Sequence, residues 1–346
     1  MELEIEAEAF DLDLTLSPSF VSSLYRRAGP GRWVKIAGLL GGDLELEQIG
    51  EILKAMSGAQ VGEEELLEIA RLETGLWHGP YEDCLRPLPP SVRPILEALG
   101  EAHPGLRLPI APLDFETILI AVSLSKRADY ERRVLAWCRG IWEAYGGDIR
   151  RLCSAPLSEL RGIGSSHQVL GLQRTLKSFL GLEERLPGEI LERFGAPEGS
   201  IAAYLLGLPP ELARIALISG CWGLGPKTAD SLILSTLKAP HFVPCDSHLR
   251  SVAFRLGLLE REAMMPRADL CSRFVCDPGQ SRLYGIGLCP KIGSCLRRSL
   301  MARLADLGGW FQTLAYIHGR AYCRALSPKC RECPIRRFCP SPSLRT

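Results

Sequence analysis

The first sixty residues alternate between apolar and polar positions, as half-buried β-strands do. Because side chains of a strand point to opposite faces in turn, a period of two predicts a sheet with one buried face. The predicted strands are 4–8, 11–16, 33–40 and 44–49. Ser17-Pro18 has the form of a helix cap followed by a first-turn proline, which predicts a short helix to about Arg27. Residues 1–62 are therefore interpreted as a small β-rich domain.

From Glu63 onward the apolar positions recur at helical spacing, and three glutamates occupy the predicted first turn. A proline-rich stretch of connecting helices, 63–112, is expected to pack with the C-terminal domain. The later predicted helices are 114–126, 130–145, 156–162, 167–180, 199–206, 210–220, 226–237, 246–257 and 299–322. The expected fold class is mainly α with a small N-terminal antiparallel β domain, α+β overall. Two helical domains, 113–240 and 241–346, complete the predicted organisation.

The net charge of +1 conceals a strong asymmetry along the chain. Residues 1–112 hold 19 acidic and 9 basic residues, whereas residues 113–346 hold 21 acidic and 32 basic ones. A basic second part suggests a polyanionic partner. The chain has neither a long apolar run nor an N-terminal leader pattern, so no membrane association and an intracellular location, cytoplasm or nucleoid, are expected.

Four cysteines near the C-terminus have the spacing of a metal centre. They are Cys323, Cys330, Cys333 and Cys339. Four thiolates in short loops can converge on one tetrahedral or cubane centre. Structural zinc usually takes two closely spaced pairs, whereas here one cysteine lies well ahead of a tight pair. The spacing therefore favours a 4Fe–4S cluster over zinc, with unliganded thiols in a basic tail as the third interpretation.

A second pattern lies between the predicted helices 210–220 and 226–237. Gly223 and Gly225 permit positive φ angles and leave backbone N–H groups uncovered, and Pro226 suits the first turn of a helix. The pattern predicts a helix-hairpin-helix whose N–H groups hold a phosphate at the positive helix end. A plain corner between two helices is the alternative.

Lys227 and Asp246 form a candidate catalytic pair. Lys227 begins the helix after the hairpin, where the positive helix end should lower its pKa and favour the nucleophilic neutral amine. Asp246, a predicted helix cap, is expected to return beside Lys227, where a carboxylate can accept protons and stabilise positive charge. A surface lysine and an ordinary cap are the alternatives.

Together these motifs resemble the helix-hairpin-helix DNA glycosylase superfamily. LGPKTAD resembles the family's hairpin, VPCDSHLRSV its segment with the essential aspartate, and the C-terminal cysteine segment the iron–sulfur loop of endonuclease III. The acidic N-terminal part is similar in architecture to that of 8-oxoguanine and alkyladenine glycosylases. Specific motifs fall within 113–346, and likeness before that is architectural only.

The resemblance implies a monomeric base-excision repair enzyme acting on double-stranded DNA that contains a damaged base. Lys227, assisted by Asp246, would attack C1′ of a flipped-out nucleotide and nick the strand by β-elimination. Gly223, Gly225 and Thr228 would hold a phosphate, with a monovalent cation at the hairpin. The alternatives are a monofunctional alkylbase glycosylase and a non-catalytic DNA-binding iron–sulfur module.

Three features depart from the family pattern or lack a clear role. Arg127, or its neighbour Lys126, stands where the family has a glutamine that fills the gap left by the extruded base, and phosphate binding is the other interpretation. His248 matches a family histidine, for which a structural role in the first helical turn is favoured over catalysis. The segment 259–298 adds Cys271, Cys276, Cys289 and Cys295, interpreted as disulfides in preference to a second metal site or buried thiols.

Overall fold

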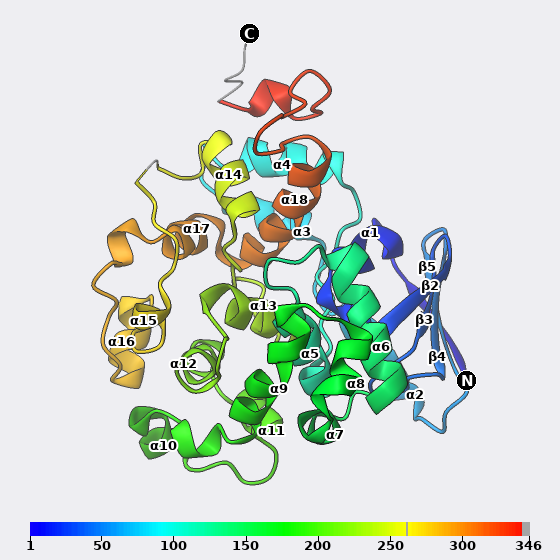
Figure 1. Ribbon diagram of the computed structural model, residues 1–346. Helices are drawn as coiled ribbons and strands as arrows, with labels where there is room; N and C mark the ends of the chain where they lie inside the picture. Colours follow the sequence, from blue (N-terminus) through cyan, green and yellow to red (C-terminus); the bar gives the residue numbers. More distant parts are fainter. Residues whose placement is uncertain (261, 341–346) are drawn as a thin grey trace.

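The computed structural model describes residues 1–260 and 262–340 and shows a small antiparallel sheet beside a large helical body (Figure 1). The strand order in the sheet is β1-β5-β4-β3-β2. The strands are β1 (Glu2–Glu6), β2 (Tyr25–Gly29), β3 (Arg32–Lys35), β4 (Leu44–Ile49) and β5 (Ile52–Ser57). A mainly helical fold with a small antiparallel N-terminal sheet is confirmed.

The helices occupy most of the chain after the sheet. They are α1 (Leu12–Leu16), α2 (Glu63–Thr74), α3 (Tyr81–Leu85), α4 (Arg93–Ala102), α5 (Phe115–Leu124), α6 (Leu135–Tyr145), α7 (Ile149–Ser154), α8 (Leu157–Ile163), α9 (His167–Leu180), α10 (Gly188–Phe194), α11 (Ile201–Gly207), α12 (Pro210–Gly220), α13 (Pro226–Thr236), α14 (Ser247–Arg255), α15 (Ala268–Cys271), α16 (Pro278–Tyr284), α17 (Leu296–Leu304) and α18 (Gly308–Ala321). Short helical turns are η1 (Phe20–Leu24), η2 (Pro112–Asp114), η3 (Tyr130–Val134), η4 (Glu183–Arg185), η5 (Ile292–Ser294), η6 (Ala305–Leu307) and η7 (Arg336–Phe338). No helix in the described ranges is long and apolar enough to cross a membrane.

The strand predicted at 11–16 is wrong, because these residues form helix α1. Asp11 caps this helix: its Oδ1 accepts a hydrogen bond from the Leu14 N–H at 2.8 Å. Leu12, Thr15 and Leu16 are buried on one face, at a spacing that suits a helix turn. A local cap thus outweighs the strand-like alternation.

Several other element boundaries differ from the prediction, three of them by the most. The helix predicted to reach Arg27 is only the turn η1, after which the chain forms strand β2. The strand predicted at 33–40 ends at Lys35, and Leu40 has a positive φ of 59°, which a regular strand does not adopt. The helix predicted at 299–322 is broken into α17 and α18 at Ala305, whose φ is 48°.

A buried ionic group joins the sheet to the helical body. Lys35 of β3 is fully buried, and its Nζ lies 2.6 Å from Glu73 Oε1 of α2 and 2.7 Å from Asp114 Oδ2 of η2. The Tyr25 hydroxyl donates to the second oxygen of Glu73. A buried charge is stable only when it is paired and hydrogen-bonded, so this group fixes where the sheet lies.

Helix α5 is buried along nearly its whole length at the centre of the helical body. It packs against α13, which also packs against α12. The end of α5 and the start of α13 consequently lie close together, and this junction forms one wall of the site described next.

Candidate active site

The turn between α12 and α13 is a tight hairpin. Gly223 has φ of 76°, in the left-handed region that favours glycine, whereas Gly225 is extended with φ of −97° and ψ of −179°. Only the first glycine therefore supplies the positive φ expected of both. The Trp222 N–H donates to Ser178 Oγ of α9 at 2.7 Å, which anchors the turn to the neighbouring helix.

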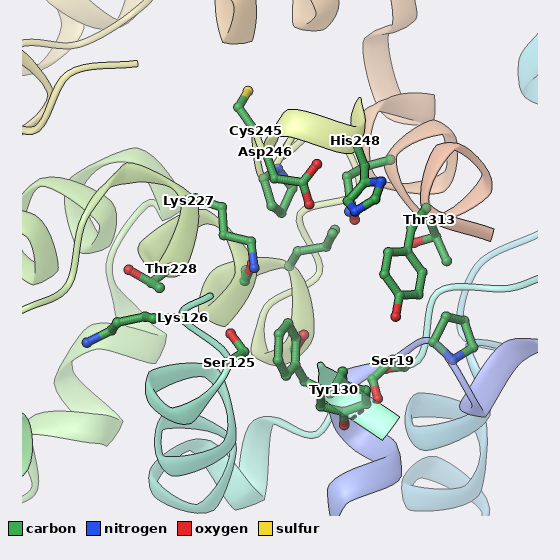
Figure 2. A pocket seen from close by; sticks show the side chains of 18 of the residues that line it. Ser19, Ser125, Lys126, Tyr130, Lys227, Thr228, Cys245, Asp246, His248 and Thr313 are labelled. Carbon is green, nitrogen blue, oxygen red and sulfur yellow. Dashed lines mark hydrogen bonds between the residues drawn. The ribbon is translucent and has the colours of Figure 1, made fainter. Parts of the chain in front are cut away.

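The hydroxyl of Thr228 closes the hairpin upon itself. It accepts from the Gly225 N–H at 2.8 Å and lies 2.9 Å from the Gly225 carbonyl oxygen, to which it donates. Thr228 is buried, and Figure 2 shows its side chain directed away from the cavity centre. In this structure Thr228 therefore shapes the hairpin from within.

Lys227 and Asp246 point toward the same space (Figure 2). Both are half-buried, and both line one cavity of about 990 Å³. Burial lowers the pKa of the Lys227 amine, and the negative charge of Asp246 opposes this effect in part. Asp246 caps α14, because its Oδ1 accepts from the Leu249 N–H at 2.8 Å. The cap fixes the direction of this carboxylate.

The sequence predicted eight residues of the catalytic and DNA-binding site, and all eight border this cavity. They are Lys126, Arg127, Gly223, Gly225, Lys227, Thr228, Asp246 and His248. The structure thus brings together segments that lie more than a hundred residues apart in the sequence. The space is of the size of ordinary ligand cavities and can take a nucleotide-sized group.

The two cations after α5 differ in direction. The side chain of Lys126 points away from Lys227 and Asp246 (Figure 2). Its Nζ lies 6.0 Å from the ring centre of Trp222 in the hairpin. Burial lowers the pKa of Lys126. Arg127 is exposed and has a positive φ of 53°, an uncommon conformation for a residue with a Cβ. Arg127 is consequently the cation of the two that remains open to a partner.

The N-terminal part of the chain contributes residues that the motifs did not predict. Phe20 of the turn η1 and its cap Ser19 line the cavity, and the Lys227 Nζ lies 5.7 Å from the centre of the Phe20 ring. Phe20 packs edge-to-face on Tyr130 at 5.2 Å, and the Tyr130 hydroxyl donates to the Ser19 carbonyl at 2.9 Å. The Ser17-Pro18 pattern predicts only a helix start, and no local pattern indicates that Phe20 faces Lys227.

Tyr316 of α18 adds a further aromatic side chain to the cavity wall. Its ring lies edge-on to that of His248, with 6.5 Å between centres. The Arg320 guanidinium donates to the Tyr316 hydroxyl at 2.6 Å and pairs with Glu131 at 3.1 Å. The cavity therefore combines aromatic surfaces with lysines, carboxylates and arginines, of which Arg320 is held in place by its partners.

Asp230 lies one helical turn after Lys227 and is fully buried. Its two oxygens pair with Arg214 Nε of α12 at 2.6 Å and with Arg297 Nε of α17 at 3.1 Å. Removing one partner from such a buried group leaves an uncompensated charge. Asp230 therefore holds three helices behind the hairpin.

The four C-terminal cysteines lie in the loop after α18 that ends beyond η7. Burial, together with the neighbouring thiols of Cys323, Cys339 and Cys330, raises the pKa of Cys333, so the four sulfurs share one region. Arg255 of α14 donates to the Cys323 carbonyl at 3.2 Å and to its Sγ at 3.4 Å.

The donor set suits a thiolate-bound metal centre, since four soft sulfur ligands select iron–sulfur clusters or zinc. Among residues 1–260 and 262–340, however, no three His, Cys, Asp or Glu side chains already stand in the arrangement of metal ligands. The cluster therefore remains a prediction. His318, whose Nε2 lies 3.4 Å from Cys333 Sγ, has its pKa lowered to about 4 by burial and by His103, and so is neutral beside the thiols.

The disulfides preferred for the segment 259–298 are not formed. Cys271, Cys276, Cys289 and Cys295 are all free thiols in the structure. These four cysteines lie away from the large cavity, and they border a separate small one instead.

Comparisons with known proteins identify the fold. No protein-family model and no curated protein sequence matches the chain. Among solved structures, the Clostridium acetobutylicum 8-oxoguanine glycosylase/lyase, in complex with double-stranded DNA, is similar with a TM-score of 0.60 at 16% identity, covering 92% of this chain and 97% of that one.

Two further structures agree with this likeness. MBOgg1 in complex with a low-affinity DNA ligand has a TM-score of 0.64 at 15% identity, covering 92% and 95% of the two chains. The 3-methyladenine DNA glycosylase from Archaeoglobus fulgidus has a TM-score of 0.58 at 13% identity, covering 92% and 99%. The chain therefore has the fold of the helix-hairpin-helix DNA glycosylases.

Proposed function

We propose that the protein is a bifunctional DNA glycosylase and AP lyase that removes a damaged base from double-stranded DNA. The observation that carries the proposal is the direction of Lys227 and Asp246, which point from the hairpin and from the cap of α14 into one cavity (Figure 2). A binding module needs basic surface but has no need of a partly desolvated amine beside a carboxylate. The glycosylase fold supports the same interpretation.

The reaction can be written with the residues of this chain. The neutral Lys227 amine attacks C1′ of the extruded nucleotide while the bond from C1′ to the base breaks and the base leaves with the bonding electrons. Asp246 stabilises the positive charge that develops at the sugar and accepts a proton from the amine. The C1′–O4′ bond of this adduct then breaks as the sugar ring opens, O4′ takes up a proton, and a Schiff base forms between Lys227 and C1′. Loss of a proton from C2′ permits β-elimination, in which the bond from C3′ to its phosphate oxygen breaks and the phosphate leaves with the bonding electrons.

The cavity offers the features that an extruded base requires. Phe20, Tyr130 and Tyr316 give aromatic surface for packing against a base, and Ser19 and Thr313 add polar groups at the wall (Figure 2). The first turn of α13 presents backbone N–H groups without acceptors inside the helix, which suits a phosphate. Carbonyl groups of the hairpin are proposed to hold a monovalent cation.

Arg127 is proposed as the residue that fills the gap in the duplex, in preference to Lys126. Arg127 is exposed at the cavity edge, whereas the Lys126 side chain is turned back against Trp222. A 4Fe–4S cluster on Cys323, Cys330, Cys333 and Cys339 is proposed to order the basic C-terminal loop for contact with the DNA backbone. The cluster supplies structural order, and no step of the reaction passes through it.

Borohydride trapping tests the mechanism, because it reduces a Schiff base to a stable protein–DNA adduct. The test uses duplexes that contain 8-oxoguanine, an alkylated purine or an oxidised pyrimidine. The 8-oxoguanine duplex is tested first, because two of the similar structures are of an 8-oxoguanine glycosylase/lyase. We expect an adduct with the wild-type protein on at least one lesion. Lys227→Ala should abolish it, a loss of at least ~10³-fold.

Lys126→Ala is the matched control, since it removes another half-buried lysine of the same cavity that points elsewhere (Figure 2). Its adduct should persist. Base release without nicking or trapping would instead identify a monofunctional glycosylase. Binding with neither base release nor an adduct on any lesion would contradict enzymatic activity altogether.

A further inference from the structure

The segment between α14 and α17 gathers four cysteines around one small cavity. Cys271, Cys276, Cys289 and Cys295 all line it, and its volume is about 20 Å³. Three of these side chains are buried and that of Cys295 is half-buried. Free thiols spread over twenty-five residues border one cavity only where the backbone brings them together.

Two isolated backbone pairings provide this arrangement. Val275 and Leu288 form a parallel bridge, in which the Cys289 N–H donates to the Val275 carbonyl at 3.0 Å. The residues that follow the two bridge positions are Cys276 and Cys289, so the bridge sets these two cysteines side by side. A second parallel bridge joins Met264 to Cys295. Cys271 comes from the last turn of α15.

The spacing of the four cysteines is that of two pairs. Four residues separate Cys271 from Cys276, five separate Cys289 from Cys295, and a longer stretch joins the two pairs. Paired thiolates with a loop between them are typical of structural zinc. The C-terminal cysteines have a different pattern, with one ligand well ahead of a tight pair.

The size of the cavity distinguishes a single ion from a cluster. A space of about 10–15 Å³ holds one water-sized sphere. The cavity of about 20 Å³ thus suits one ion, whereas a cubane of four iron and four sulfur atoms needs several times this space.

Basic side chains surround the four thiols. Arg267, Lys291 and Arg298 line the same cavity, and the positive charge of the buried Arg214 acts on Cys271. A zinc ion with four thiolates is an anionic centre, and neighbouring guanidinium and ammonium groups offset that charge. In the described residues the thiols are not yet grouped as metal ligands. To bind the ion, they would lose their protons to solvent and turn their sulfur atoms toward the cavity.

We propose that Cys271, Cys276, Cys289 and Cys295 bind one zinc ion in a closed, structural site. This site is separate from the C-terminal cysteine loop and takes no part in the reaction itself. The loop that it would fix carries Met265 and Pro266, which border both the small cavity and the large one. Zinc would therefore hold one wall of the candidate active site in place.

Metal analysis of the full-length protein tests the proposal without any measurement of activity. We expect about one zinc per chain, and its loss from the double variant Cys276→Ser and Cys289→Ser. The variant Cys330→Ser and Cys333→Ser should retain zinc and lose any iron. Cys153→Ser, a buried cysteine of α7 outside both groups, should change neither metal.

A second measurement uses the wild-type chain, in case the double variant does not fold. The four thiols should resist alkylation in the native protein and react after a zinc chelator is added, as peptide masses would show. Cobalt in place of zinc should give the absorption of a tetrahedral thiolate site.

Three results would overturn the proposal. The first is a wild-type protein without zinc whose four thiols react freely before chelation. The second is thiols that, after denaturation, react only once a reductant is added, which would reveal disulfides. The third is a wild-type protein that contains iron and no zinc, with that iron lost from the double variant Cys276→Ser and Cys289→Ser.

Discussion

At the scale of single residues, the amine of Lys227 is subject to two opposing influences. Burial disfavours the charged ammonium and lowers its pKa, while the carboxylate of Asp246 favours the charged form. The net effect is a lowered pKa, so more of the amine is neutral near pH 7 than for a lysine in water at about 10.4. Only the neutral amine can act as the nucleophile.

This balance predicts the pH dependence of adduct formation. Replacement of Asp246 by Asn removes the influence that raises the pKa of Lys227, so that pKa should fall further. The rising limb of the rate against pH should move to lower pH, although the maximum rate itself decreases because the carboxylate is lost. Single-turnover trapping measured from neutral pH up to about 10 checks this.

Asparagine is the appropriate replacement because it also caps helices well and can keep the bond to the Leu249 N–H. A helix that loses its cap would confuse the result, and circular dichroism verifies that α14 persists. A rising limb that stays in place, or moves to higher pH, would contradict the assignment of Asp246 as the neighbouring charge.

At the scale of elements, the two glycines of the hairpin have different tasks. Gly223 provides the left-handed turn, and a Cβ there would lie 2.9 Å from the Lys126 amine. Gly225 has an extended backbone with open space where a Cβ would be. The hairpin therefore depends on glycine at one of these positions and tolerates a side chain at the other.

The variants Gly223→Ala and Gly225→Ala test this difference directly. We expect Gly223→Ala to lower the free energy of unfolding by about 1–2 kcal/mol, the cost of a Cβ in the left-handed region. Gly225→Ala should change it by less than ~0.5 kcal/mol. Urea unfolding of both proteins, compared with wild type, gives the two values, and equal losses would show that the positive φ is unimportant.

Regular elements with strong apolar periodicity were predictable, whereas their breaks were not. Helices 167–180 and 210–220 match α9 and α12 at both ends. The residues 11–16 satisfy both a strand and a helical spacing, and the Asp11 cap decides in favour of the helix. The break at Ala305 has no proline or glycine at the broken position that would predict it.

The candidate site was predictable in part, for a related reason. Lys227, Asp246 and the hairpin glycines belong to short local patterns. Phe20 does not, because it approaches Lys227 only after the N-terminal part of the chain has packed against the helices, and Tyr130 packs against Phe20. A contact between segments two hundred residues apart leaves no trace in a local pattern.

At the scale of the whole molecule, the sheet is held to the helical body by the buried charges of Lys35, Glu73 and Asp114. Replacement of Lys35 by alanine would leave two buried carboxylates without their cation. We expect a loss of about 3–5 kcal/mol in the free energy of unfolding, measured by urea denaturation.

Lys54 provides the matched comparison within the same sheet. Its Nζ pairs with Glu2 and Glu4, whose side chains are 54% and 60% exposed. Because exposed pairs contribute little, Lys54→Ala should cost no more than ~1 kcal/mol. Similar losses for the two variants would show that the buried group does not join the sheet to the helices.

The approach of Phe20 to Lys227 has a consequence for how the protein is made. Phe20 leaves the ribosome well before Tyr316, yet both border the same cavity. Chains under synthesis fold from the N-terminus onward, and contacts between distant segments form late. A chain that has not yet reached Tyr316 consequently lacks a finished pocket, so Lys227 acquires its complete surroundings only after Tyr316 has emerged.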